Sequence, residues 1–77
     1  MLLSEVKPNQ KVTITSIKSN TLKLHLLKMG LQVGGTIKIC KKISNGPIVL
    51  IHNSQEIILG NENIKLIEVS VAHDSLP

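Results

Sequence analysis

The sequence of 77 residues contains no Phe, Trp or Tyr, no Arg and a single Cys, and each absence excludes a class of function. Without aromatic side chains the chain cannot line a groove for proline-rich peptides or build a cage for a quaternary amine. Modules that bind single-stranded nucleic acids stack the bases on aromatic rings or Arg planes, and this chain has neither. The lone Cys40 cannot close an internal disulfide, so the chain lacks the framework of a small secreted domain.

Long apolar segments are missing as well. The longest uninterrupted apolar run, Ile48 to Ile51, is too short to span a bilayer, and the N-terminus lacks the basic stretch and apolar run of a signal peptide. The sequence therefore predicts a cytoplasmic protein that is not itself a membrane protein. Its length allows one small domain, which we place at residues 1–71, followed by a flexible C-terminal tail at residues 72–77.

What the chain does contain is aliphatic side chains and lysine. Hydrophobic residues make up 42% of the sequence and most of them are Ile, Leu or Val, so the chain can form a packed core. All nine basic residues are lysines, and most of them lie in residues 1–42, whereas residues 43–77 carry a net negative charge. This asymmetry is typical of a domain that meets an acidic protein surface, an anionic membrane or nucleic acid, but solvated surface lysines give the same pattern.

Alternation of apolar and polar residues predicts five β-strands, at residues 11–17, 36–41, 48–52, 55–59 and about 65–71. The two-residue loop Asn53-Ser54 joins the third strand to the fourth and fixes the register of a hairpin. In this register Leu50 pairs with Ile57 on one face of the hairpin. Val49 pairs with Ile58 on the other face, so both faces are apolar.

One short helix is predicted between the first two strands. Leu22, Leu26 and Met29 recur on one helical face, Ser19-Asn20 offers an N-cap, and Gly30 provides a left-handed stop. A helix of about nine residues is unstable alone, so its apolar face must pack on a larger body. Because short strands expose fewer edges when they curl, we expect a mainly β fold, a small five-stranded, partly open barrel with one short α-helix between strands 1 and 2 that closes one end.

Several short motifs, in order, resemble the ferrous iron transport protein A (FeoA) family. The opening Leu3-x-x-Val6-Lys7-Pro8-x-Gln10-Lys11 is similar to the start of that family. The segment Leu26-Leu27-Lys28-Met29-Gly30-Leu31-x-x-Gly34 is similar to the end of its helix. The hairpin and closing strand follow the family pattern up to Val69, so the resemblance covers nearly the whole chain.

The resemblance implies both a fold and a role. The fold is an SH3-like barrel, and the role is that of a cytoplasmic accessory protein of ferrous iron uptake. The implied partner is the cytoplasmic GTP-binding part of a FeoB-type membrane permease, which the accessory protein binds and modulates. When bound to the permease, the accessory protein would lie at the inner face of the membrane.

Residues that could carry chemistry are isolated from one another. The candidate metal ligands or nucleophiles are separated by eleven to twenty residues, and they are His25, Cys40, His52 and His73. No Cys-x-x-Cys or His-x-x-x-His spacing occurs, and Gly34-Gly35 lacks the Lys and Ser/Thr of a phosphate-binding loop. We therefore predict no enzymatic activity, no cofactor and no direct iron site.

The outer face of the hairpin is the first candidate surface for a partner. It carries Val49, Ile51 and Ile58, opposite the face that points into the barrel. Two explanations are open. Either the N-terminal leucines or the helix cover this face, or it is exposed and docks a partner or a second copy of the chain.

The exposed side of the helix is the second candidate surface. It carries Lys23, His25 and Lys28, and we expect Lys41 and Lys42 to lie near them when the barrel closes. Such a face fits an acidic surface on the permease or the anionic inner leaflet beside it.

Two other functions stay open at this point. A small basic barrel can bind nucleic acid non-specifically through phosphates, although without Arg and aromatic side chains it is poorly equipped to read bases. Alternatively, the chain is a stand-alone SH3-like interaction or oligomerisation domain of the type found in iron-dependent repressors. Because no helix-turn-helix precedes the barrel, we do not expect the chain to act as such a repressor by itself.

Overall fold

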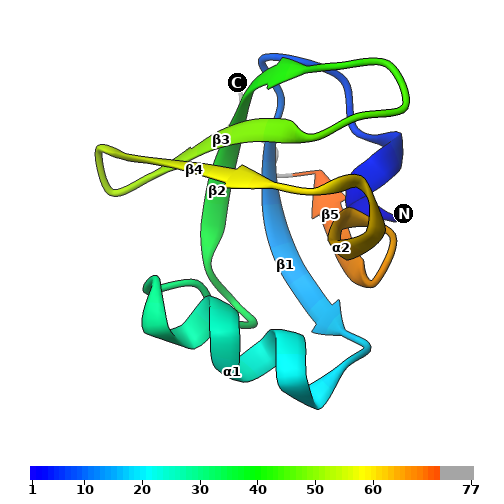
Figure 1. Cartoon of the computed structure of the whole chain (residues 1–77). Helices are drawn as coiled ribbons and strands as arrows, with labels where there is room; N and C mark the ends of the chain where they lie inside the picture. The colour runs from blue at the N-terminus through cyan, green and yellow to red at the C-terminus, as the bar shows by residue number, and fades with distance from the viewer. Residues whose placement is uncertain (72–77) are drawn as a thin grey trace.

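Five antiparallel strands form one strongly curved sheet in the order β4-β3-β2-β1-β5 (Figure 1). The computed structural model describes residues 1–71, and the predicted tail lies outside the described residues. The strands are β1 (Lys11–Ile17), β2 (Thr36–Lys42), β3 (Ile48–His52), β4 (Gln55–Leu59) and β5 (Ile67–Val71). The helices are α1 (Asn20–Lys28), the short α2 (Asn61–Ile64) and a single 3-10 turn, η1 (Leu3–Glu5). The expected mainly β fold with a short helix between strands 1 and 2 is confirmed.

The core consists of aliphatic side chains only. Every buried side chain of the described residues is Ile, Leu or Val, which is how a chain without aromatics fills a barrel. The strand residues predicted to point inward, among them Ile14 and Ile39, are almost completely buried. Across the lower end of the sheet in Figure 1 lies α1, which inserts Leu22 and Leu26 into the core.

Both ends of α1 are held as the sequence predicts. The Ser19 hydroxyl accepts a hydrogen bond from the Leu22 N–H at 3.2 Å and caps the first turn. At the other end Gly30 has a φ of +85°, and the Leu31 N–H donates to the Leu26 carbonyl at 2.9 Å. The reversal brings Leu31 back into the core, so the helix stop also buries an apolar side chain.

The predicted hairpin register is confirmed. Leu50 lies opposite Ile57 and Val49 lies opposite Ile58. The loop residues Asn53 and Ser54 have φ values of 50° and 65°, as a type I′ turn requires, and this turn suits the twist of the two strands.

The ends of the chain differ from the expectation. The last strand begins at Ile67 rather than at residue 65, because α2 forms just before it, and neither α2 nor η1 was predicted. Beyond the outer edge of β5, the chain adds one more short pairing: the Val69 N–H donates to the Met1 carbonyl at 2.8 Å, and Leu2 forms a bridge with Glu68. The first residues of the chain thus cover one edge of the sheet.

A β-bulge at Cys40 changes which way β2 presents its lysines. The register with β3 shifts between Ile39 and Lys41, so Lys41 lies opposite Val49 on the outer face. Lys42 lies opposite Ile48 and turns to the inner side of the sheet. Simple alternation along β2 therefore fails after Cys40.

Candidate functional site

The outer hairpin face, which we define as Val49, Ile51 and Ile58, is exposed. Ile58 exposes 65% of its surface and Ile51 exposes 38%, whereas Val49 is half-buried. Of the two explanations left open by the sequence, coverage by the N-terminal leucines or the helix is wrong, because Ile51 and Ile58 stay exposed. In residues 1–71 the outer hairpin face meets solvent, and this is the condition for a docking surface.

Charged residues flank the outer hairpin face. Lys38 lies opposite Ile51, and Lys41 lies opposite Val49, so β2 borders the aliphatic side chains with two lysines. On the other side Glu56 lies opposite Ile51 in β4. The face is therefore an aliphatic strip with a basic border along β2 and one acidic residue on β4, as in interfaces with an apolar centre and a charged rim.

The surface of α1 presents more than the predicted basic residues. Lys23, His25 and Lys28 are exposed, as expected. Between them Leu24 and Leu27 expose 62% and 51% of their surfaces, and neither was among the predicted surface residues. The signal was present, because a nine-residue helix with four leucines has more apolar side chains than one face can bury.

Two shallow cavities border α1. One, of about 220 Å³, is lined by Lys23, Leu27, Gln32 and Val33. The other, of about 260 Å³, includes His25 and lies between α1 and the segment that leads from α2 into β5, where Asn63 and Leu66 line it. The helix surface is thus partly apolar and bordered by two cavities, of which Lys23 lines one and His25 lines the other.

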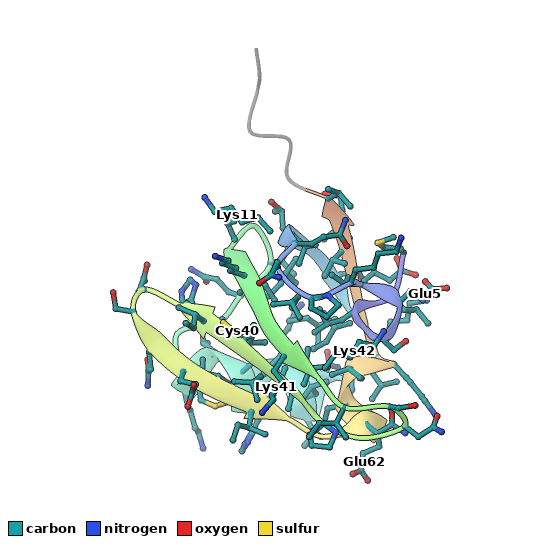
Figure 2. The ribbon with its side chains drawn as sticks, turned by 90° about the horizontal axis from the view of Figure 1, so that it is seen from above. Glu5, Lys11, Cys40, Lys41, Lys42 and Glu62 are labelled. Atoms are coloured by element: carbon teal, nitrogen blue, oxygen red, sulfur yellow. The ribbon has the colours of Figure 1, made fainter. Side chains whose placement is uncertain are left out.

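The expectation that Lys41 and Lys42 lie near the α1 lysines is wrong. Figure 1 shows that β2 starts beside α1 and ends at the opposite end of the sheet, so its last two residues are remote from the helix. In Figure 2, Lys42 lies towards the N-terminal segment that carries Glu5, whereas Lys41 lies away from it. The bulge at Cys40, which alternation along the strand could not reveal, separates the two lysines.

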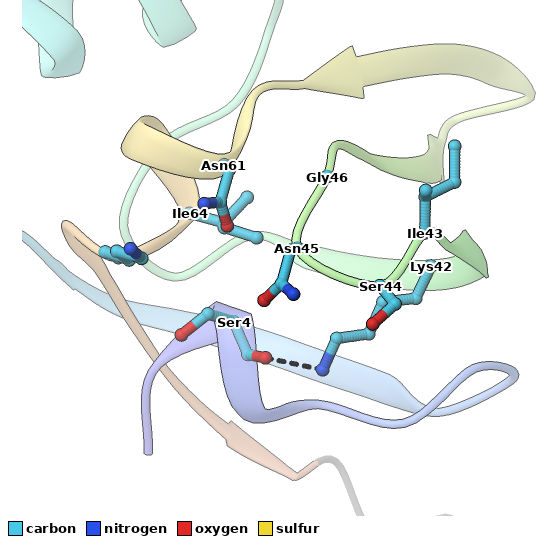
Figure 3. Close-up of a pocket in the computed structure, with 9 residues that line it drawn as sticks. Ser4, Lys42, Ile43, Ser44, Asn45, Gly46, Asn61 and Ile64 are labelled. Atoms are coloured by element: carbon cyan, nitrogen blue, oxygen red, sulfur yellow. Dashed lines mark hydrogen bonds between the residues drawn. The ribbon is translucent and has the colours of Figure 1, made fainter.

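Lys42 is fixed in a structural position. Its Nζ donates to the carbonyls of Ser4 and Val6, the latter at 3.2 Å, and so ties the end of β2 to the N-terminal segment. This contact forms one wall of a cavity of about 310 Å³ that also includes Asn45 and Asn61 (Figure 3). We therefore remove Lys42 from the partner surfaces.

The isolated candidate ligands stay apart in the structure. Within residues 1–71, no three His, Cys, Asp or Glu side chains come close enough to hold a metal ion. His52 is engaged locally, with Nδ1 at 3.1 Å from the Thr36 carbonyl and Nε2 at 3.3 Å from the Asn53 amide nitrogen. Because a carbonyl only accepts, His52 Nδ1 is the donor in the contact with Thr36. Cys40 is half-exposed at the bulge, and His73 lies outside the described residues.

One ion pair of residues 1–71 involves no residue of either candidate surface. Lys18 Nζ is 2.8 Å from a carboxylate oxygen of Glu68, and it joins the end of β1 to β5. Hydrogen bonding and charge attraction from Lys18 lower the pKa of the Glu68 carboxyl below its ordinary value.

A family model for the FeoA domain matches residues 1–71. The chain belongs to the FeoA family. The resemblance seen in the motifs is thereby confirmed, and membership supports a role in ferrous iron transport. None of the helices in residues 1–71 is long and apolar enough to cross a lipid bilayer.

Solved structures support the same fold. A crystal structure of an iron uptake regulatory protein (FeoA) is 25% identical with a TM-score of 0.84, and the match covers 94% of this chain and 97% of that one. Iron(II) transport protein A from Clostridium thermocellum is 32% identical with a TM-score of 0.81, covering 92% of this chain and 45% of that one. ScaR with bound Zn²⁺ is 28% identical with a TM-score of 0.77, and the match covers 90% of this chain and 35% of ScaR. A comparison with curated proteins finds no match.

Proposed function

We propose that the chain is a non-enzymatic, cytoplasmic accessory protein of ferrous iron uptake that binds and modulates the GTP-binding part of a FeoB-type permease. The observation that carries the proposal is the outer hairpin face, an exposed aliphatic strip on a domain of the FeoA family. Lys38 and Lys41 border this strip and give the partner site its expected chemistry. The permease should offer an apolar centre with acidic groups on the side that meets β2.

Burial of the apolar surface on the outer hairpin face is the expected source of the binding energy. Ile58 and Ile51 expose apolar surface to water, and burying such surface contributes about 25 cal/mol per Å² before the cost of association. Without aromatic side chains or Arg, the face lacks the residues that dominate most binding hot spots. We therefore expect a small and transient interface rather than a permanent complex.

Modulation follows if the two nucleotide states of the permease differ in affinity for this face. A ligand shifts a two-state equilibrium only by the ratio of its affinities for the two states. The accessory protein needs no chemistry of its own to act in this way, because its binding energy alone favours one state of the permease. The direction of the shift is read from the affinities for the GTP-bound and GDP-bound forms.

Titration of the purified permease GTP-binding domain with this chain tests the proposal. We expect Ile51→Lys to weaken binding at least tenfold, because it replaces an exposed apolar side chain of the outer hairpin face by a charge. Ile43→Lys is the matched control, since Ile43 exposes a similar fraction, 49%, but lies in the loop after β2. Leu24→Lys shows whether α1 contributes.

The outcomes are distinct. If Leu24→Lys abolishes binding while Ile51→Lys has no effect, the outer hairpin face is not the docking site. If the wild-type chain does not bind the permease domain in either nucleotide state, the proposed function fails. Tighter binding to unrelated DNA or RNA at physiological salt would favour the nucleic-acid alternative instead.

A further inference from the structure

The outer edge of β4 is the uncovered edge of the sheet. The opposite edge strand, β5, is covered by the pairing of Met1 and Leu2 with Val69 and Glu68. No such cover lies along β4 within the described residues, since β4 pairs with β3 alone. Edge strands usually carry a Lys, a Pro or a bulge that discourages pairing. The sequence of β4, Gln-Glu-Ile-Ile-Leu, has no Lys or Pro, its only charged side chain is Glu56, and its register with β3 is regular.

The hairpin register identifies the free hydrogen-bonding groups. In a two-residue hairpin the residues that flank the loop form a hydrogen-bonded pair, here His52 with Gln55, and such pairs then alternate along the strands. Ile57 and Leu59 therefore bond to β3, whereas the backbone groups of Glu56 and Ile58 point away from it. No backbone bond outside the helices and strands of residues 1–71 involves either of these two residues.

Gly60 prolongs this free edge. Its φ of −70° and ψ of 161° continue the extended conformation of β4, and its N–H points the same way as those of Glu56 and Ile58. The Gly60 carbonyl already accepts bonds from Asn63 and Ile64. The edge thus offers three N–H donors and two free carbonyls to an incoming strand.

We propose that this edge pairs with β4 of a second copy of the chain, antiparallel, with Ile58 opposite the partner subunit's Ile58. The result is a two-fold dimer with one continuous ten-stranded sheet. The inference concerns the chain by itself and does not depend on the proposed binding of a permease.

The side chains of β4 determine which register is favoured and which incoming strand fits the edge. A residue can form a hydrogen-bonded pair across this edge only if its backbone groups face the edge, as those of Glu56, Ile58 and Gly60 do. Three antiparallel registers near the centre of β4 satisfy this condition. One places Glu56 against the partner's Glu56 and is repulsive, and a second places Glu56 against the partner's Ile58. The third places Ile58 against the partner's Ile58 and Glu56 beside the partner's Gly60. An incoming strand needs an apolar residue opposite Ile58 and a residue that is not acidic opposite Glu56, and β4 with the following Gly60 meets both conditions.

In this register the exposed side chains of the two copies meet. Ile58, the most exposed large apolar side chain of the described residues, packs on its counterpart, and each Ile58 already lies beside Val49 in its own copy. Four aliphatic side chains then form one strip across the two-fold axis. A five-residue strand gives a small interface, so we expect a weak dimer with a Kd of about 0.1–1 mM.

Salt distinguishes this dimer from a complex held by charge. Two copies that each carry a net charge of +4 repel one another, whereas the contacts at β4 are apolar and backbone contacts. Added salt screens the repulsion and should strengthen the dimer. A complex driven by the lysines and an acidic partner should weaken under the same change.

Sedimentation equilibrium from about 10 μM to 1 mM, with interference optics because the chain has no Trp or Tyr, measures the dimer. Ile58→Pro removes the outward N–H without touching the bonds to β3, and we expect it to raise the Kd at least tenfold. Gly60→Pro is a second variant, because φ at Gly60 already suits proline. Ile58→Val keeps the N–H and should still dimerise, as should Leu24→Lys, in which an equally exposed apolar side chain of α1 is replaced.

Amide spectra confirm that each variant is folded and locate the interface. On dilution of the wild-type chain, we expect the amide signals of Glu56, Ile58 and Gly60 to shift most. A chain that stays monomeric at 1 mM refutes the inference. A dimer that persists in both proline variants, or that Leu24→Lys abolishes, refutes it as well.

Discussion

Replacing Gly30 by Ala tests how firmly the stop of α1 determines the position of the helix. Gly30 has a φ of +85°, where an L-residue with a Cβ is strained by about 1–2 kcal/mol. No atom lies within 4 Å of the Cβ that the substitution adds, so the cost is that of the backbone alone. The more restricted unfolded chain of the Ala variant offsets about 0.4–1 kcal/mol of this strain. We expect a net loss of about 1 kcal/mol.

Thermal and urea unfolding followed by far-UV circular dichroism measure this loss. For a domain of this size about 1 kcal/mol lowers the Tm by roughly 4–8 °C. Gly30→Asn is the matched control, because Asn tolerates a left-handed conformation better than Ala and should cost less. If Ala and Asn are equally harmless, the left-handed stop is not what ends α1. If Ala costs more than about 4 kcal/mol, the loss must come from packing around Leu31 rather than from φ.

Two further predictions concern the stability of the barrel. Leu26→Ala should cost about 2–5 kcal/mol in urea unfolding, because Leu26 is buried under α1, whereas Leu27→Ala should cost less than about 0.5 kcal/mol, because Leu27 is half-exposed. Because Lys18 holds the pKa of Glu68 below its ordinary 4.5, the stability gained from this ionised carboxylate is present above pH 4.5 and is lost as the pH falls through the lower folded-state pKa. The stability deficit of Glu68→Gln should therefore shrink on acidification from pH 7 to pH 3, and a deficit independent of pH would contradict this assignment.

The hairpin and the helix were predictable because local signals agree there. Asn53-Ser54 is a two-residue loop between two apolar runs, and once it is identified the register of every pair in the hairpin follows. In α1 the cap at Ser19 and the stop at Gly30 delimit a segment whose leucines recur at helical spacing. In each case the residues that determine the structure lie close together in the sequence.

What the sequence could not show depends on contacts between distant segments. The four residues of α2 contain one buried side chain, Ile64, which is too little for a periodic pattern. The bulge at Cys40 arises where β2 meets β3, and it alone sends Lys42 to the N-terminal segment instead of to the outer face. The prediction that placed Lys41 and Lys42 beside the helix failed for another reason, because β2 runs away from α1 and ends at the opposite end of the sheet.

The candidate site was predictable in composition but not in extent. Strand parity correctly assigned Val49, Ile51 and Ile58 to one face, whereas their exposure depended on what the N-terminal leucines do in three dimensions. The exposed leucines of α1 are a different case. The helix contains more leucines than one helical face can bury, so the exposure of some of them could have been predicted from the sequence.

A core made only of Ile, Leu and Val also makes this domain well suited to methyl NMR spectroscopy. Each buried side chain of residues 1–71 ends in methyl groups, so selective labelling of three amino-acid types places a probe at every position of the core. Ile51 and Ile58 receive the same label on the outer hairpin face. A single spectrum therefore follows the packed interior and the exposed strip together, and it can separate a ligand that only touches the surface from one that rearranges the barrel.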